Sequence, residues 1–164
     1  MKIHFIGIGG IGLSGLARVL HTQGHEVTGS DLKETMITKS LNSIGIEVSI
    51  PQASKNINDH DLVVYSAVVH ADNVERKKAE ALGIKSIPRK ALLPMILDTK
   101  KVYAVAGAHG KSTTTAILTA ILQSDAIIGA ESKEFDCNVR FLDRELIAFE
   151  ADESDGSFLN SNLA

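Results

Sequence analysis

The residues with the clearest capacity for chemistry form the segment Gly107-Ala108-His109-Gly110-Lys111-Ser112-Thr113, which follows an apolar run over residues 101–106. An apolar strand that breaks into a glycine-bounded turn ending in Lys-Ser, and then becomes compatible with a helix, is the local layout of a phosphate-binding loop. Glycine lets backbone N–H groups turn toward an anion with no Cβ in the way. Lys111 can reach the outer phosphates, and the Ser112 hydroxyl suits Mg²⁺. The segment therefore predicts a site for a nucleoside triphosphate.

This loop is shorter than the Gly-x-x-x-x-Gly-Lys-Ser/Thr pattern. Counted back from Gly110, the first glycine of that pattern would fall at Val105, whereas the chain has it at Gly107. The alternative interpretation is a glycine-rich turn with an ordinary solvated lysine. The apolar strand before the loop and the helix-compatible segment after it favour the phosphate loop.

A second glycine-rich segment follows the apolar run near the N-terminus. Gly7, Gly9 and Gly12 satisfy the Gly-x-Gly-x-x-Gly pattern. Asp31 ends the next expected strand about 20 residues later, at the spacing of a ribose-binding acid. On its own this pattern indicates NAD. The pattern requires only a backbone that can approach a diphosphate, so the diphosphate of UDP would fit as well. A third interpretation is that these glycines serve only the packing of helix against strand.

A third segment joins an apolar run at residues 146–149 to four carboxylates, Glu150, Asp152, Glu153 and Asp155. Such a run places hard oxygen ligands at the carboxyl end of a strand, where open α/β sheets bind ligands. In isolation, an acidic turn that caps a helix is the simpler interpretation. Because a phosphate loop needs a magnesium partner, we expect this run to provide a metal ligand.

Composition excludes several classes of protein. The chain has 164 residues and a formal charge of −3, and it lacks the run of about 18 apolar residues that spans a bilayer. Its first residues enter an apolar strand pattern without the layout of a signal peptide. The single cysteine, Cys137, excludes an internal disulfide framework. Low aromatic content and the lack of a basic run argue against nucleic-acid binding. We expect a cytoplasmic protein that binds neither membrane nor nucleic acid.

The elements that would position these residues alternate between strands and helices. Apolar periodicity predicts strands at residues 3–8, 26–29, 47–50, 61–65, 85–87, 102–105, 126–128 and 146–151. It predicts helices at residues 11–23, 35–44, 73–82, 89–97 (interrupted at Pro94) and 111–123. A polar stretch at 131–144 fits a hairpin or a loop. The alternating order implies an α/β fold with a parallel, doubly wound sheet.

We expect a domain boundary after residue 98. Residues 1–98 would form a Rossmann-like domain, and residues 99–164 the beginning of a P-loop-type ATP-binding α/β domain. This second portion is close to the lower limit of about 50 residues for a domain, and its few elements would leave sheet edges uncovered. We therefore expect the chain to be part of a larger protein, or to complete its core with a partner.

Four segments together resemble the signatures of one family, the Mur ligases. They are HFIGIGGIGLSGLA from His4, VTGSDL from Val27, VAGAHGKSTTT from Val105 and FEADESDGSFL from Phe149. The resemblance covers the whole chain and implies an ATP-dependent ligase of peptidoglycan-precursor synthesis, in which a carboxylate is phosphorylated to an acyl phosphate that an amine then attacks. The implied substrates are UDP-N-acetylmuramate and L-alanine. The segment at residues 153–158 looks more like the members that add alanine than those that reattach a recycled tripeptide.

The resemblance also implies roles for individual residues. Lys111 would be catalytic and hold the β- and γ-phosphates of ATP, while Ser112 and Glu150 would ligate Mg²⁺. The ATP cradle would comprise Gly107, Ala108, His109, Gly110, Lys111, Ser112 and Thr113, although a direct role and packing in an apolar site are equally open for His109. The residues implied to bind UDP-sugar are Gly9, Gly10, Ile11, Gly12, Asp31 and Ser66.

The chain departs from the family pattern at several positions. Ala108 replaces a threonine, Tyr65 a serine and Val74 a proline, and Pro51-Gln52 stands where members often have Gly-His near the uracil. The family's second-metal segment, its modified lysine and its C-terminal amino-acid-binding domain have no counterpart. We therefore expect an N-terminal fragment that binds UDP-sugar without turnover. The alternative functions are an NAD(P)-dependent oxidoreductase and a non-enzymatic nucleotide-binding module.

Overall fold

The computed structural model describes residues 1–98, 100–132 and 137–151. Contacts divide the chain into two compact units, Met1–Arg89 and Lys90–Ala164. Helix α4 (Arg89–Leu97) belongs to the second unit except for its first residue. The expected boundary after residue 98 would assign the whole helix to the first unit. The helix also continues through Pro94, which corrects the expected interruption there. A proline in a helix interior removes one hydrogen bond and crowds the carbonyl four residues earlier, which can kink a helix without ending it.

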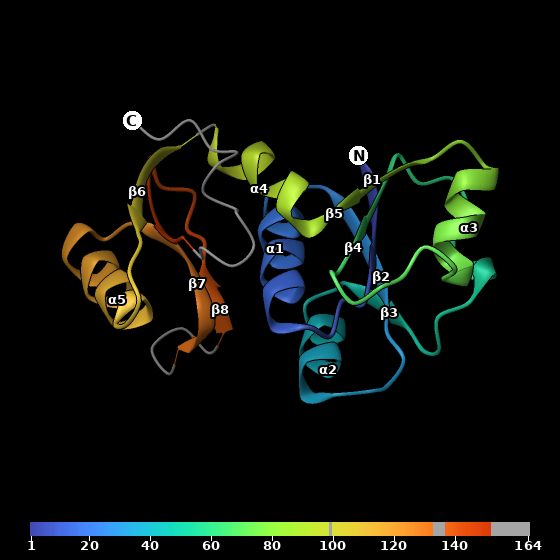
Figure 1. Cartoon of the computed structure of the whole chain (residues 1–164), viewed down its shortest axis with the longest axis horizontal. Helices are drawn as coiled ribbons and strands as arrows, with labels where there is room; N and C mark the ends of the chain where they lie inside the picture. The colour runs from blue at the N-terminus through green and yellow to red at the C-terminus, as the bar shows by residue number, and fades with distance from the viewer. Residues whose placement is uncertain (99, 133–136, 152–164) are drawn as a thin grey trace. The chain divides into compact units, whose positions relative to one another are not determined.

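The first unit is built on a five-stranded parallel sheet with the strand order β3-β2-β1-β4-β5 (Figure 1). Its strands are β1 (Lys2–Ile6), β2 (Glu26–Ser30), β3 (Glu47–Ser49), β4 (Leu62–Tyr65) and β5 (Lys85–Pro88). The chain adds β2 and then β3 on one side of β1, and it then crosses to the other side of β1 to add β4 and β5. The point between β1 and β4 is therefore a topological switch point. Open α/β sheets bind ligands at this switch point, outside the carboxyl ends of the strands. The expected doubly wound, Rossmann-like sheet is thereby confirmed.

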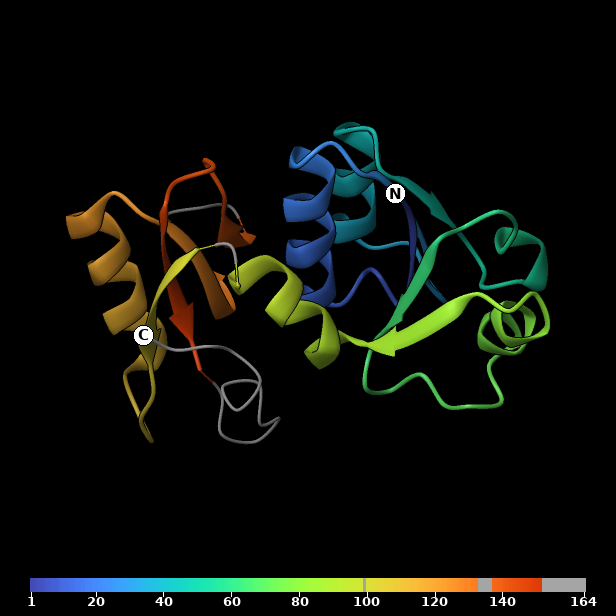
Figure 2. The ribbon, with the colours of Figure 1, turned by 90° about the horizontal axis from the view of Figure 1, so that it is seen from above.

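Helices cover both faces of this sheet. Figures 1 and 2 show α1 (Ile11–Thr22) and α2 (Met36–Ser43) on one face and α3 (Val74–Ala81) on the other. A short 3₁₀ helix, η1 (Ser54–Asn56), precedes β4. Because both faces are covered, the central strands β1 and β4 are buried over most of their length. The side chains of Ile3, Phe5 and Leu16 are fully buried in this core.

The helix ends follow from local sequence. Thr35 and Thr38 form a capping box that starts α2, and Asn73 caps α3. Gly45 and Gly83, just after α2 and α3, have φ values of +90° and +70°. Residues with a Cβ rarely adopt this left-handed conformation, so glycine is the favoured residue at the ends of both helices.

The second unit contains a four-stranded sheet with the order β6-β9-β7-β8. Its strands are β6 (Lys101–Val105), β7 (Asp125–Ser132), β8 (Cys137–Arg140) and β9 (Leu146–Glu150). Strands β6, β9 and β7 are parallel, whereas β8 pairs antiparallel with β7. The polar stretch therefore contributes a strand of a hairpin. Helix α5 (Lys111–Leu122) packs against β7 and β9. Within the three described ranges, no helix has the length and apolarity needed to cross a membrane.

Candidate functional site

The first glycine loop connects β1 with α1 at the carboxyl edge of the first sheet. Gly7 has a φ of +82°, and its N–H donates to Ser30 O at 2.8 Å. The Gly10 N–H donates back to Gly7 O at 3.2 Å, and α1 begins directly afterwards. The first N–H groups of a helix have no carbonyl partner within it, and they carry the positive end of the helix dipole. This end of α1 is therefore suited to an anionic group.

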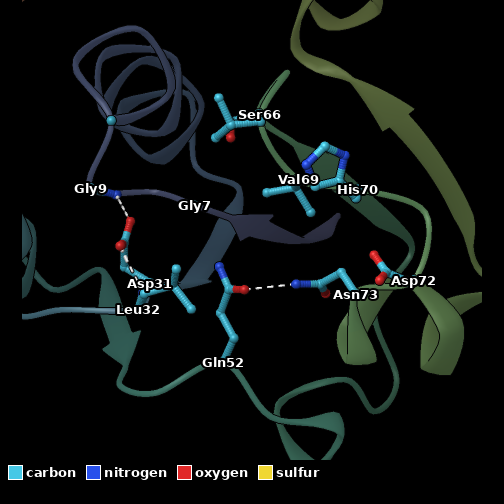
Figure 3. Close-up of a pocket in the computed structure, with 12 residues that line it drawn as sticks. Gly7, Gly9, Asp31, Leu32, Gln52, Ser66, Val69, His70, Asp72 and Asn73 are labelled. Atoms are coloured by element: carbon cyan, nitrogen blue, oxygen red, sulfur yellow. Dashed lines mark hydrogen bonds between the residues drawn. The ribbon is translucent and has the colours of Figure 1, made fainter.

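A pocket of about 480 Å³ opens beside this loop (Figure 3). Its walls come from the segments that follow β1, β2 and β4 and from those that precede η1 and α3. The lining residues are Gly7, Gly9, Gly10, Asp31, Leu32, Gln52, Ser66, Val68, Val69, His70, Asp72 and Asn73. Of the residues predicted to bind UDP-sugar, Gly9, Gly10, Asp31 and Ser66 line the pocket. Ile11 and Gly12 lie in the first turn of α1 and are not among the lining residues.

Asp31 braces the glycine loop. Its Oδ2 accepts the Gly9 N–H at 2.8 Å, and its Oδ1 accepts the Leu32 N–H at 2.7 Å. A Cβ at Gly9 would lie 2.8 Å from the same Oδ2, so the close approach requires glycine there. Each carboxylate oxygen can accept more than one hydrogen bond. Asp31 can therefore hold the loop and still accept a hydroxyl from a ligand.

Two amide side chains in the pocket were absent from the predicted site residues. Asn73 Nδ2 donates to Gln52 Oε1 at 2.7 Å (Figure 3), while Asn73 Oδ1 accepts the backbone N–H groups of Glu75 and Arg76. Capping of α3 thus fixes Asn73, which in turn orients Gln52. An asparagine before a helix is a recognisable cap signal, but no spacing in the sequence indicates that it would meet Gln52.

The second glycine loop connects β6 with α5. Gly107 and Gly110 have φ values of +149° and +77°, in the region that favours glycine. Lys111, the first residue of α5, folds back so that its Nζ donates to Gly107 O at 2.7 Å. The predicted cradle residues Ala108, His109 and Thr113 are exposed, and no described residue encloses His109 in an apolar site. The loop therefore presents a lysine amine and a helix N-terminus in one place.

The pair predicted to ligate metal lies in contact. Ser112 Oγ donates to Glu150 Oε1 at 3.2 Å. Across residues 1–98, 100–132 and 137–151, no group of three or more His, Cys, Asp or Glu side chains could hold a metal ion. A cation beside this pair would need further oxygens from phosphate and water, as Mg²⁺ commonly has. Asp152, Glu153 and Asp155 lie outside the described residues.

A comparison of the sequence with protein families covers the first sheet and its glycine loop. The model described as "Mur ligase family, catalytic domain" matches residues 2–101, which is more than half of the chain. The chain belongs to the Mur ligase family.

Individual relatives narrow the comparison. The chain is 56% identical over 162 residues to a UDP-N-acetylmuramate–L-alanine ligase of Campylobacter jejuni, with 98% of this chain and 38% of the relative covered. Among solved structures, it is similar to the UDP-N-acetylmuramate-alanine ligase MurC of Thermotoga maritima. The TM-score is 0.84 and the identity 33%, over 94% of this chain and 37% of that one.

A second solved structure has the same TM-score of 0.84. It is a UDP-N-acetylmuramate:L-alanyl-gamma-D-glutamyl-meso-diaminopimelate ligase of Neisseria meningitides, 27% identical over 98% of this chain and 54% of that chain. The chain spans between a third and two fifths of the length of the curated alanine ligases that it matches.

Proposed function

We propose that this chain is the part of an ATP-dependent ligase that binds UDP-N-acetylmuramate and ATP, and that the complete protein joins the sugar nucleotide to L-alanine. The observation that carries this proposal is the presence of two different nucleotide-type loops, one in each unit, each between a parallel strand and a helix N-terminus. An enzyme that phosphorylates the carboxylate of a nucleotide sugar needs two such sites. The names of the alanine-adding relatives at 52% and 56% identity support the same substrates.

In the first unit, the glycine loop would take the diphosphate of UDP-N-acetylmuramate. The backbone N–H groups of Ile11 and Gly12 face no side-chain cap at the start of α1, so they are suited to phosphate oxygens. Gly10, whose N–H donates to Gly7 O, would shape the turn that brings them to the diphosphate. Asp31 would accept a ribose hydroxyl. Ser66, whose hydroxyl lies beside Gly7 of the loop, would add a hydroxyl donor.

In the second unit, the loop at residues 107–110 would surround the phosphates of ATP. Lys111 would exchange its contact with Gly107 O for the β- and γ-phosphates, and Thr113 would complete the cradle. Ser112 and Glu150 would hold Mg²⁺, because their two oxygens already lie side by side. When bound, Mg²⁺ offsets the charge that spreads over the phosphate oxygens during transfer. The chain's own contribution would be to position the phosphates and place the Lys111 charge beside them.

Calorimetric titration of this chain with UDP-N-acetylmuramate, and separately with NAD⁺, tests the proposal. We expect binding of the sugar nucleotide and none of NAD⁺. Binding of NAD⁺ alone would return the first glycine loop to the oxidoreductase interpretation. Titration with ATP and Mg²⁺ tests the second unit independently, and its failure would leave the sugar-nucleotide site standing.

A second candidate is the ligase that attaches a recycled tripeptide to the same sugar nucleotide. The TM-score supports this candidate as well as it supports the alanine ligase, whereas sequence identity favours the alanine ligase. Both candidates share the two sites of this chain. Phosphate release by the complete protein with L-alanine, compared with the tripeptide as acceptor, distinguishes them. Both act on nucleotides, in keeping with the cytoplasmic location expected from the sequence.

A further inference from the structure

Glu75 is a fully buried carboxylate that the proposed ligand contacts do not use. It is the second residue of α3, and its exposed fraction is 0%. Three donors from two other segments reach it. The Ser30 hydroxyl donates to Oε2 at 2.5 Å, while the Asn56 side-chain amide and the Ala53 N–H donate to Oε1 at 2.7 and 3.1 Å. A buried charge costs free energy unless such partners satisfy it, so this arrangement requires a specific geometry.

Two of the three donors to Glu75 adjoin residues that line the pocket. Ser30 precedes Asp31, which braces the glycine loop, and Ala53 follows Gln52. Glu75 itself shares the first turn of α3 with the cap of that helix, Asn73, whose side chain donates to Gln52. Three walls of the pocket therefore converge on one carboxylate behind it.

The surroundings keep this carboxylate charged. Burial on its own raises the pKa of the Glu75 carboxyl, but interactions with His4, Ser30 and Asn56 outweigh burial and hold the pKa below its usual value. His4 Nε2 lies 3.7 Å from Oε2, which is too long for a hydrogen bond. His4 therefore acts on the Glu75 carboxylate through electrostatic attraction. Hydrogen bonds to an ionised acceptor are stronger than those between neutral groups.

We propose that Glu75 is a positioning residue for the sugar-nucleotide pocket, holding Asp31, Gln52 and Asn73 at fixed separations through the segments that carry them. It does not touch the ligand. The inference rests on the proposed function of this pocket. Binding groups need support from neighbouring hydrogen bonds to keep their geometry within about 0.5 Å.

Substitution Glu75→Gln tests this role because it keeps the side-chain shape but removes the charge and exchanges one acceptor for a donor. The new NH₂ group can face Ser30, whose hydroxyl then accepts instead of donating. What the substitution removes is the negative charge that strengthens all three hydrogen bonds. We expect calorimetry to show an affinity of this chain for UDP-N-acetylmuramate that is weaker by about tenfold, the order of loss when outer-shell partners of a binding site are removed. Glu80→Gln is the matched control, since it makes the same change at an exposed position of α3, and its affinity should be unchanged.

A control for stability separates positioning from general weakening of the fold. Val19→Ala creates a cavity in the buried face of α1, away from the pocket walls, and lowers the melting temperature without touching Glu75. Titrations are run where circular dichroism shows every variant to be folded. Val19→Ala should keep the affinity of the unsubstituted chain. An equal loss of affinity in Val19→Ala and Glu75→Gln would overturn the positioning role.

Asn56→Ala provides a second route if Glu75→Gln does not fold. It removes one donor to Glu75 Oε1 from a partly exposed residue and leaves the carboxylate in place. We expect a weakening of affinity of about threefold, smaller than for Glu75→Gln because two donors remain. Unchanged affinity in both variants would overturn the inference alone. Absence of binding by the unsubstituted chain would overturn the proposed function and this inference with it.

Discussion

The hydroxyl of Ser112 lies 3.2 Å from Glu150 Oε1, although 38 positions separate the two residues in the chain. Pairing of β6 with β9 brings them together, because Val105 at the end of β6 lies opposite Glu150. The loop at residues 107–110 then returns the chain so that α5 starts beside the same strand end. A hydroxyl and a carboxylate in contact at the start of a helix offer two hard oxygens to a cation that accompanies phosphates.

This pair yields a prediction about magnesium. Ser112→Ala removes one of the two oxygens, so we expect the Mg²⁺ concentration that supports half-maximal ATP binding to rise about tenfold. Ser112→Thr is the matched variant and should retain the requirement of the unsubstituted chain, because it keeps the hydroxyl. Calorimetric titrations of ATP over a series of Mg²⁺ concentrations measure both. An identical Mg²⁺ requirement in the alanine and threonine variants would contradict a role for this hydroxyl.

Lys111 yields a prediction about the independence of the two sites. Lys111→Ala removes the amine that now contacts Gly107 O, and we expect the complete protein to lose ATP-dependent phosphate release by about 100-fold or more. Binding of UDP-N-acetylmuramate should stay within twofold, because the pocket lies in the other unit. Lys101→Ala, at an exposed lysine of β6, is the control and should be active. A parallel loss of both functions in Lys111→Ala would contradict the assignment of separate sites.

Most of the fold could be predicted because its elements carry local signals. The apolar runs at β1, β4 and β9 and the glycines after α2 and α3 are read from neighbouring residues alone. Strand β8 spans only four residues, Cys137–Arg140, inside a polar stretch, so its brief alternation does not distinguish it from a loop. It forms because β7 offers it a partner, with Ile127 opposite Val139. The residues of β8 alone therefore do not show where this strand begins and ends, because its pairing with β7 decides that.

The site could be predicted only where backbone shape decides it. Glycine spacing indicated both loops, and Asp31 was found from its distance along the chain. The contact of Gln52 with Asn73 and the role of Glu75 are not predicted, because both depend on side chains from separate segments that meet only in the folded unit. A buried glutamate in a charged helix such as α3 has the same sequence signal as a solvated one.

Gly29 yields a prediction about packing beneath the glycine loop. A Cβ built at this buried position of β2 would lie 2.5 Å from Ile8 Cδ1 and 2.8 Å from Ile8 Cβ. Because Ile8 Cβ is attached to the main chain of the loop, a rotamer change cannot relieve the contact. We expect Gly29→Ala to lower the free energy of unfolding by about 1–3 kcal/mol, as measured by urea denaturation.

The control for this prediction is Gly10→Ala, whose added Cβ would meet only Gly7 O, at 3.5 Å. Gly10 has a φ of −72°, which alanine also adopts, so the free energy of unfolding should change by less than about 0.5 kcal/mol. Equal free energies of unfolding for the two alanine variants would show that the main chain at Ile8 can move away from the added Cβ without loss of stability. The contact between β2 and the loop would then not constrain the loop.

Acid should destabilise the first unit in two steps. Burial, and then the charge of His4, lower the pKa of His60 below its usual 6.5, against the opposing charges of Asp59 and Glu26. Just below pH 6.5 the unfolded chain therefore binds a proton at His60 that the folded chain does not, and stability falls as the pH falls. His25 contributes in the same window, because burial and the N-terminal charge lower its pKa too.

The second step belongs to Glu75, whose folded pKa is held below the usual 4.5. Its contribution is present above that value and is lost as the pH falls through the folded pKa, since the unfolded carboxyl takes up a proton first. Urea denaturation from pH 8 to pH 4 should show the free energy of unfolding declining below pH 6.5 and again below pH 4.5.

His60→Gln should flatten the first decline and leave the second in place. The ring of His60 contacts Thr28 Oγ1 at 3.2 Å and accepts the Asn58 N–H at Nδ1, so a glutamine amide can replace part of these hydrogen bonds without titrating. At pH 8 the imidazole is neutral in both states, so the slopes of the variant and the unsubstituted chain should coincide there. Equal slopes between pH 6.5 and pH 5.5 would contradict the assignment of this step to His60, and would leave His25 as its source.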